Sequence, residues 1–214
     1  MLRILLVLTG MLFAFSVYAI TNQELITNLN SRLIDIRGNG SLIKSYSDHS
    51  QSYIYDQALA IITFTKENDK ARARKLLKAM NDLQMKDGSL YFSYNLDGTS
   101  VYPEAGDKRI AGAMAWVSLA SSHYQKKFNS QEFVHFNLKL LSYLHSQIDS
   151  VKINDVETRA LRFAPSDVLS TPFPENEVAA LEHNIDAYVA MMSFEEINKT
   201  GKWKEDITQL KTFI

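Results

Sequence analysis

Apolar helical segments alternate with amphipathic ones along this chain, and this alternation most restricts how it can fold. Residues 53–64 are apolar almost all round, as is typical of a helix that is buried on every side. In residues 69–85 the apolar positions form one stripe, while Lys and Arg occupy the other faces, as is typical of a surface helix. Together the two segments predict a helical hairpin with an inner and an outer member.

The same pair of segments recurs twice more. Residues 107–125 are rich in Ala, Gly and Met and carry no charge after Arg109, whereas residues 131–147 are amphipathic. Residues 175–198 supply a third apolar helix, and residues 204–214 begin a third amphipathic partner. The inner helices of the three pairs should therefore be more buried than the outer ones.

Alternating residues predict short strands in two of the connections, Leu90–Asn95 and Val151–Phe163. The expected fold class is all-α, built from about three helical hairpins with short β segments between them. In such repeat architectures each hairpin packs mainly on its neighbours.

The first residues resemble an export signal rather than a folded element. Arg3 precedes the apolar run Ile4–Phe15, and the small residues Val17 and Ala19 occupy the −3 and −1 positions of a signal-peptidase site. We expect cleavage after Ala19, which leaves residues 20–214 as one exported domain in the periplasm or outside the cell. An uncleaved N-terminal anchor is the alternative.

The mature chain should begin with a helix. Thr21-Asn22-Gln23-Glu24 forms a capping box, and an apolar stripe continues to Ile36, where Gly38-Asn39-Gly40 should stop the helix.

Composition excludes several classes of function. The formal net charge is −1 and no basic run occurs, so binding to nucleic acid has no electrostatic basis. Cysteine is absent, which excludes disulfides, thiolate metal sites and cysteine nucleophiles. No P-loop or dinucleotide fingerprint occurs, and the histidines lack metal-ligand spacing, so no metal or cofactor is expected.

A family resemblance rests on five strings that occur in order. They are Tyr55-Asp56-Gln57-Ala58-Leu59-Ala60, Lys86-Asp87-Gly88-Ser89, Ser93-Tyr94-Asn95, Ala113-Met114-Ala115-Trp116 and Glu182-His183-Asn184-Ile185-Asp186-Ala187-Tyr188. Over roughly residues 50–214 the chain resembles bacterial members of the six-hairpin glycosidase-like (α/α) toroid superfamily. The last string is the most specific part of the resemblance.

The resemblance implies a ring of inner helices surrounded by outer helices, with a carbohydrate cleft at one end of the ring. A complete toroid has six hairpins, whereas about three are expected here. We therefore expect a truncated gene product. A partner chain that completes the ring and an open half-ring are the alternatives.

Three acidic residues are the candidate catalytic groups. Glu182 and Asp186 are spaced i, i+4 and so share one helix face, with Cβ atoms about 5–6 Å apart. A pair of carboxylates with different pKa values can act as the acid and the base of glycoside hydrolysis. Because toroid glycosidases usually invert configuration, we pair one of these two with Asp56, which aligns with Asp186 on the pattern Asp-x-x-x-Ala.

Further residues are candidates for binding substrate. His183 and Asn184, with a tyrosine, could instead act as a polysaccharide lyase on a uronate. Arg109 could pair with a substrate carboxylate or with Asp56. The complete set of predicted binding residues is Tyr55, Tyr94, Asn95, Arg109, Trp116, His183, Asn184 and Tyr188.

These candidates should converge on one concave surface, because acid and base must both reach one substrate. The leading hypothesis is an exported, glycoside hydrolase-like protein that binds carbohydrate, and it leaves open whether the chain is catalytically active. The alternative is a non-catalytic half-toroid that binds a glycan or a partner.

Overall fold

The computed structural model describes residues 21–36, 38, 40–101, 108–153, 155–164 and 178–214. These residues divide into two compact units, with the boundary between Ser31 and Arg32. The predicted signal-peptide segment, residues 1–19, lies outside the described residues. Helix α2 (Asn22–Arg32) begins at the predicted capping box. The Thr21 N–H donates to the Glu24 carboxylate at 2.8 Å, and the Glu24 N–H donates to Thr21 Oγ1 at 3.2 Å.

The expectation that this helix continues to Ile36 is wrong. Leu33–Asp35 forms strand β1, which pairs antiparallel with β2 (Ser41–Ile43), with Leu33 opposite Ile43. Residue Gly40 lies so close to the outer helix behind it that a Cβ there would be 2.9 Å from the backbone of Ala79. Tertiary packing of this hairpin therefore overrides the helical period of the sequence.

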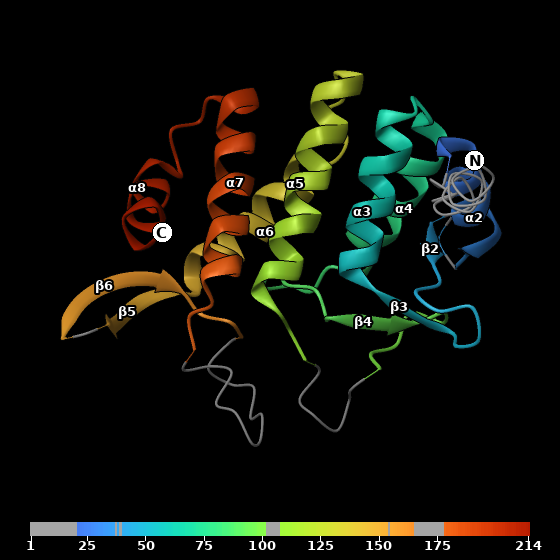
Figure 1. Ribbon diagram of the computed structural model, residues 1–214. Coiled ribbons are helices and arrows are strands. Elements are labelled where there is room, and N and C mark those ends of the chain that lie inside the picture. The colour runs from blue at the N-terminus through green and yellow to red at the C-terminus, as the bar shows by residue number, and fades with distance from the viewer. Residues whose placement is uncertain (1–20, 37, 39, 102–107, 154, 165–177) are drawn as a thin grey trace, which may run out of the picture. The chain divides into compact units, whose positions relative to one another are not determined.

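Three helical hairpins make up most of the second unit (Figure 1). The inner helices are α3 (Ile54–Lys66), α5 (Ala111–Phe128) and α7 (Leu181–Asn198). The outer helices are α4 (Lys70–Leu83), α6 (Val134–Ser146) and α8 (Lys204–Phe213). The inner helices stand side by side in the order α3, α5, α7 and all begin at the same end, the lower end in Figure 1.

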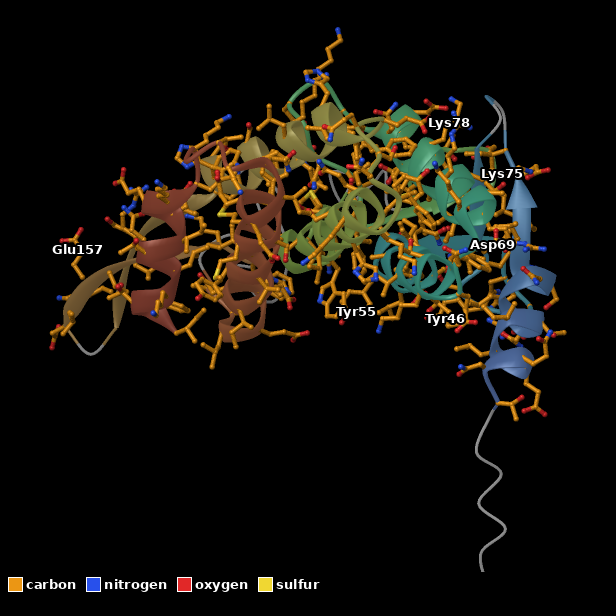
Figure 2. All side chains as sticks on the ribbon, turned by 90° about the horizontal axis from the view of Figure 1, so that it is seen from above. Tyr46, Tyr55, Asp69, Lys75, Lys78 and Glu157 are labelled. Atoms are coloured by element: carbon orange, nitrogen blue, oxygen red, sulfur yellow. The ribbon has the colours of Figure 1, made fainter. Side chains whose placement is uncertain are left out.

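Burial confirms the predicted inner and outer members of the first two hairpins. In α3 only Leu59 and Lys66 are exposed, and the residues outside its buried stripe are mostly half-buried. In α4 the buried residues form the single stripe Ala73, Leu76, Leu77, Ala79 and Met80, and most of the remaining residues are exposed. Seen from above, Lys75 and Lys78 lie on the α4 side of the unit, and Tyr55 lies on the opposite side (Figure 2). The N-terminus of α4 is capped by Asp69, whose side chain accepts from the Arg72 N–H at 3.1 Å.

Helix α7 differs from the expectation that it is buried all round. Four apolar residues along one face of the helix are between 38% and 54% exposed: Leu181, Ile185, Val189 and Met192. We call this set the α7 edge. Helix α5 lies between two other inner helices, whereas within the described part of the chain α7 has an inner helix on one side only.

Short strands lie in the connections, as predicted, with shifted bounds. Strand β3 (Gln51–Tyr53) pairs antiparallel with β4 (Ser93–Asn95), so the predicted strand at 90–95 is shorter than expected. Strands β5 (Ile148–Ile153) and β6 (Val156–Leu161) form an antiparallel hairpin after α6. In the part of the chain that the structure describes, no helix combines the length and apolarity that crossing a membrane requires.

Candidate functional site

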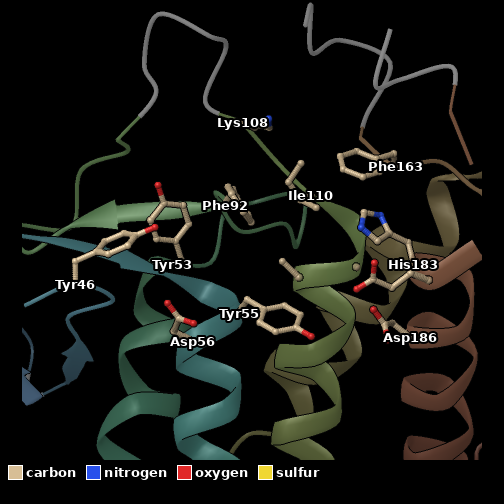
Figure 3. Close-up of a pocket in the computed structure, with 13 residues that line it drawn as sticks. Tyr46, Tyr53, Tyr55, Asp56, Phe92, Lys108, Ile110, Phe163, His183 and Asp186 are labelled. Carbon is tan, nitrogen blue, oxygen red and sulfur yellow. The ribbon is translucent and has the colours of Figure 1, made fainter. Parts of the chain in front are cut away.

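A pocket of about 570 Å³ opens at the end of the second unit where the inner helices begin (Figure 3). This volume is in the range of pockets that bind small molecules or parts of larger ligands. The described residues that line it are Tyr46, Tyr53, Tyr55, Asp56, Phe92, Lys108, Ile110, Gly112, Ala113, Phe163, Glu182, His183 and Asp186.

Each inner helix contributes its second and third residues to this pocket. These are Tyr55 and Asp56 from α3, Gly112 and Ala113 from α5, and Glu182 and His183 from α7. The connecting loops are held at the first residues of two helices: the Ile54 N–H donates to the Phe92 carbonyl at 3.1 Å, and the Ala111 N–H donates to the Phe163 carbonyl at 3.0 Å. The repeat itself therefore places the start of every hairpin at one site.

Aromatic rings form the wall of the pocket on the α3 side. The Tyr53 ring meets the Phe92 ring edge to face at 5.1 Å and the Tyr46 ring at 6.0 Å. Edge-to-face pairs of this kind hold rings in fixed orientations. The wall offers flat apolar faces beside polar groups, a combination that suits the faces and hydroxyls of a sugar ring.

Three carboxylic acids reach the pocket from opposite sides. Asp56 lies in the first turn of α3, Glu182 lies in the first turn of α7, and Asp186 lies one turn further along α7 (Figure 3). The sequence alignment of Asp56 with Asp186 therefore does not match the structure. Asp56 is the third residue of α3, and the third residue of α7 is His183, one turn before Asp186. Because Asp56 and Glu182 come from different helices, a ligand can lie between them.

Asp186 has the most perturbed acidity of the three. Burial raises the pKa of Asp186 to about 6, and the neighbouring charge of Glu182 acts in the same direction. Trp116 lies close enough to offset part of this rise, but no hydrogen bond of normal geometry forms, since Asp186 Oδ2 and Trp116 Nε1 are both buried without a partner among the described residues. Asp186 is therefore the carboxyl best suited to hold a proton near neutral pH.

Tyr55 lies among these acids. Burial, followed by the charges of Asp186, Glu182 and Asp56, raises the pKa of the Tyr55 phenol, so it stays protonated. Its ring also contacts Trp116 on α5, with ring centroids 5.3 Å apart. The Tyr55 phenol is thus within electrostatic range of all three acids.

His183 forms the wall of the pocket on the α7 side. Its side chain is 8% exposed, and its ring stacks on Phe163 with centroids 4.2 Å apart and planes at 27°. Burial lowers the pKa of His183 below its usual 6.5, so the imidazole is neutral at pH 7. Its Nδ1 atom is buried and has no hydrogen-bond partner among the described residues.

The predicted residues Arg109, Tyr94 and Asn95 are not among the described pocket lining. Arg109 lies before α5 rather than inside it, which corrects the expectation, and pairs with Asp87 at 3.2 Å. Tyr94 is buried, and its hydroxyl accepts from the Tyr91 N–H at 2.9 Å. Asn95 contacts Thr99 in its own turn.

Three other candidates also lie outside the lining. The buried Asn184 amide is occupied by backbone: it accepts from the Leu161 N–H at 2.7 Å and donates to the Leu161 and Ala180 carbonyls. The hydrogen bonds between Asn184 and Leu161 hold α7 against β6. Trp116 is half-buried behind Tyr55 and Asp186, and Tyr188 is half-buried on α7.

Tyr46, Lys108, Gly112 and Phe163 also line the pocket and were not among the residues predicted from the sequence. Lys108 and Gly112 lie just before and within the first turn of α5, so position near the start of an apolar helix could have indicated them. Tyr46 and Phe163 lie in connections between helices and carry no such signal. In the described part of the chain no three His, Asp or Glu residues gather in a way that could hold a metal ion.

Comparison with solved structures finds longer toroid enzymes. The endoglucanase Cel10, a family 8 glycosyl hydrolase from Klebsiella pneumoniae, matches with a TM-score of 0.60 and 14% identity over 87% of this chain and 56% of that chain. A GH8 endo-β-1,4-glucanase from an Achatina fulica gut metagenomic library matches with a TM-score of 0.59 and 15% identity over 94% of this chain and 59% of that chain. This chain thus spans less than two thirds of either structure. No protein-family model matches the sequence, and no curated relative matches it.

The fold of the chain is that of part of an (α/α) toroid. The resemblance to the six-hairpin glycosidase-like superfamily, drawn from the sequence strings, is confirmed at the level of the fold.

Proposed function

We propose that this chain is an exported, glycoside hydrolase-like protein that binds a carbohydrate in the pocket at the start of its inner helices. The observation that carries the proposal is the meeting of Asp56 with Glu182 and Asp186 in one aromatic-walled pocket, although 126 positions separate the first two (182 − 56). Acids that merely satisfied local partners would have no reason to share one cavity.

The acids have different roles in this proposal. Asp186, whose pKa burial raises to about 6, is the general acid that protonates the glycosidic oxygen. Asp56, on the far wall, is the base that activates water, and Glu182 raises the pKa of Asp186 through its charge. The Tyr55 hydroxyl and the aromatic wall hold the sugar between them.

A β-1,4-linked glucan is the first substrate to test, because the two solved structures are named as a glucanase and an endoglucanase. The lyase alternative has less support. A uronate carboxylate needs a neutralising cation, whereas His183 is neutral, the Asn184 amide is occupied by backbone, and the three acids in the described lining outnumber its lysine, Lys108.

The test is hydrolysis of soluble β-1,4-glucans, mixed-linkage β-glucan and a polyuronate, read out as new reducing ends. Calorimetry should measure binding in parallel for the parent protein and for Asp56→Asn and Asp186→Asn. Turnover that the variants lose while they retain binding supports an enzyme. Binding without turnover in the parent supports a non-catalytic glycan-binding half-toroid. If the parent shows no binding and no turnover, both the enzyme and the glycan-binding protein are contradicted.

A second candidate function, binding of a partner chain, is favoured by the α7 edge. Its apolar residues recur at Leu181, Ile185, Val189 and Met192, so the edge can pack against the same edge of a second copy. Sedimentation should then show self-association that Ile185→Glu abolishes and Val156→Glu, at the exposed β5–β6 turn, leaves intact. A monomer at every concentration contradicts this second function.

A further inference from the structure

We propose that Gly112 is a positioning residue of the pocket, because the absence of a side chain there is what allows the His183 imidazole to lie against α5. The inference deepens the proposed function and relies on it only for the identity of the ligand. The position of the imidazole itself follows from the geometry of two inner helices.

The space that a side chain at residue 112 would need is filled by His183. A Cβ atom on Gly112 would lie 2.3 Å from His183 Cδ2 and 2.8 Å from both Cγ and Nε2. These distances are well below van der Waals contact, and Cγ belongs to the rigid base of the ring rather than to a flexible end. Any larger residue must therefore displace the imidazole or separate α5 from α7.

Glycine is otherwise a poor choice at this position. In a helix it is less favourable than alanine by about 1 kcal/mol. The helix has alanine on both sides, at Ala111 and Ala113, and all three residues are buried. A glycine between two buried alanines is explained by the close approach of His183.

The other face of the imidazole is covered by Phe163, at a centroid distance of 4.2 Å. The ring is therefore held between the α5 backbone and an aromatic ring, and this fixes its orientation in the pocket wall. The same enclosure removes the imidazole from water. Displacement of the ring would change both the shape of the pocket and the environment of the imidazole.

The variant Gly112→Ala tests this inference. The readout is a pH titration of the histidine ring by NMR, with the His183 signal assigned by comparison with His183→Gln. In the parent protein His183 should titrate below its usual 6.5, because burial lowers its pKa. In Gly112→Ala the titration should move up toward the usual value, because the displaced ring gains contact with water. Affinity for a bound β-glucan oligosaccharide should fall by about tenfold or more.

Gly40→Ala is the matched control. It is also overcrowded, since its Cβ would lie 2.9 Å from the backbone of Ala79, but Gly40 is not part of the described pocket lining. It should lower stability while leaving the His183 titration and the glucan affinity unchanged. A general loss of packing would affect both variants alike, and that result would overturn the inference.

A second variant keeps the test decisive if Gly112→Ala does not fold. Phe163→Ala uncovers the other face of the ring without overcrowding and should raise the His183 titration as well. An unchanged His183 titration in the variants that fold would contradict the inference. If the titration moves as expected but the parent binds no glucan, the positioning of His183 stands and the proposed function fails.

Discussion

Nδ1 of His145 on α6 lies 2.9 Å from Oδ2 of Asp206 on α8, and this contact joins two outer helices. Asp206 is 3% exposed, whereas the His145 side chain is about half exposed. A buried carboxylate without a partner is costly, so the imidazole contact contributes to holding the last helix on the hairpins before it.

We therefore expect His145→Ala to lower the free energy of unfolding by about 1–3 kcal/mol, the cost of leaving a buried polar group without its partner. Urea denaturation at pH 7 measures it. His135→Ala is the control, because His135 is an exposed histidine on the same helix. Equal losses in the two variants would show that the Asp206 contact adds nothing.

The raised pKa of Asp186 predicts a pH dependence of stability. Its folded pKa of about 6 is above the unfolded value of 3.8, so between these values the folded protein holds a proton that the unfolded chain has lost. This group therefore stabilises the fold less and less as pH rises from about 4 to about 6. Asp186→Asn should raise the melting temperature relative to the parent at pH 7.5 and much less at pH 4. Melting curves that differ by the same amount at every pH would contradict the prediction.

If Asp186 is the general acid, activity should depend on its proton. Turnover of a soluble β-glucan should fall as pH rises above about 6, and Asp186→Asn should lower turnover by about 10²–10⁴-fold. Initial rates across pH 4–8 test both. Glu157→Gln, an exposed acid on β6, should leave the profile unchanged. A profile that rises through pH 6 would assign the acid role elsewhere.

Export predicts a defined mature N-terminus. Cleavage behind Val17-x-Ala19 should leave Ile20 as the first residue of material recovered from the periplasm or medium of an expressing bacterium. Intact-mass spectrometry measures it directly. Recovery of the chain with Met1 still attached would support the uncleaved anchor instead.

Helical period was sufficient to predict the three hairpins, because inner and outer helices differ in how their apolar residues are distributed. It failed at Leu33–Asp35, where pairing with Ser41–Ile43 decides the structure and no local signal records that partner. It also failed for α7, because burial on the far side of a helix depends on a neighbour that its own residues do not reveal.

The site was predictable in part for a similar reason. Asp56, Glu182 and Asp186 stand out because acids are rare on apolar helices, and the structure brings them to one pocket. Arg109 and Asn184 stood out equally, yet their side chains contact Asp87 and the Leu161 backbone. Gly112 and Phe163 carry no chemical signal in sequence, since their importance lies in contact with His183.

The common direction of α3, α5 and α7 also sets the electrostatics of the pocket. Each helix N-terminus carries a partial charge equivalent to about half a positive elementary charge. None of these three N-termini has a side-chain cap among the described residues, unlike α4. Three helix macrodipoles therefore direct their positive ends at the cavity that holds Asp56, Glu182 and Asp186. With Lys108 also in the lining, the side chains leave a net negative charge that the backbone of the same pocket partly offsets, and an oxygen that gains negative charge during bond cleavage would meet a favourable potential at the helix N-termini.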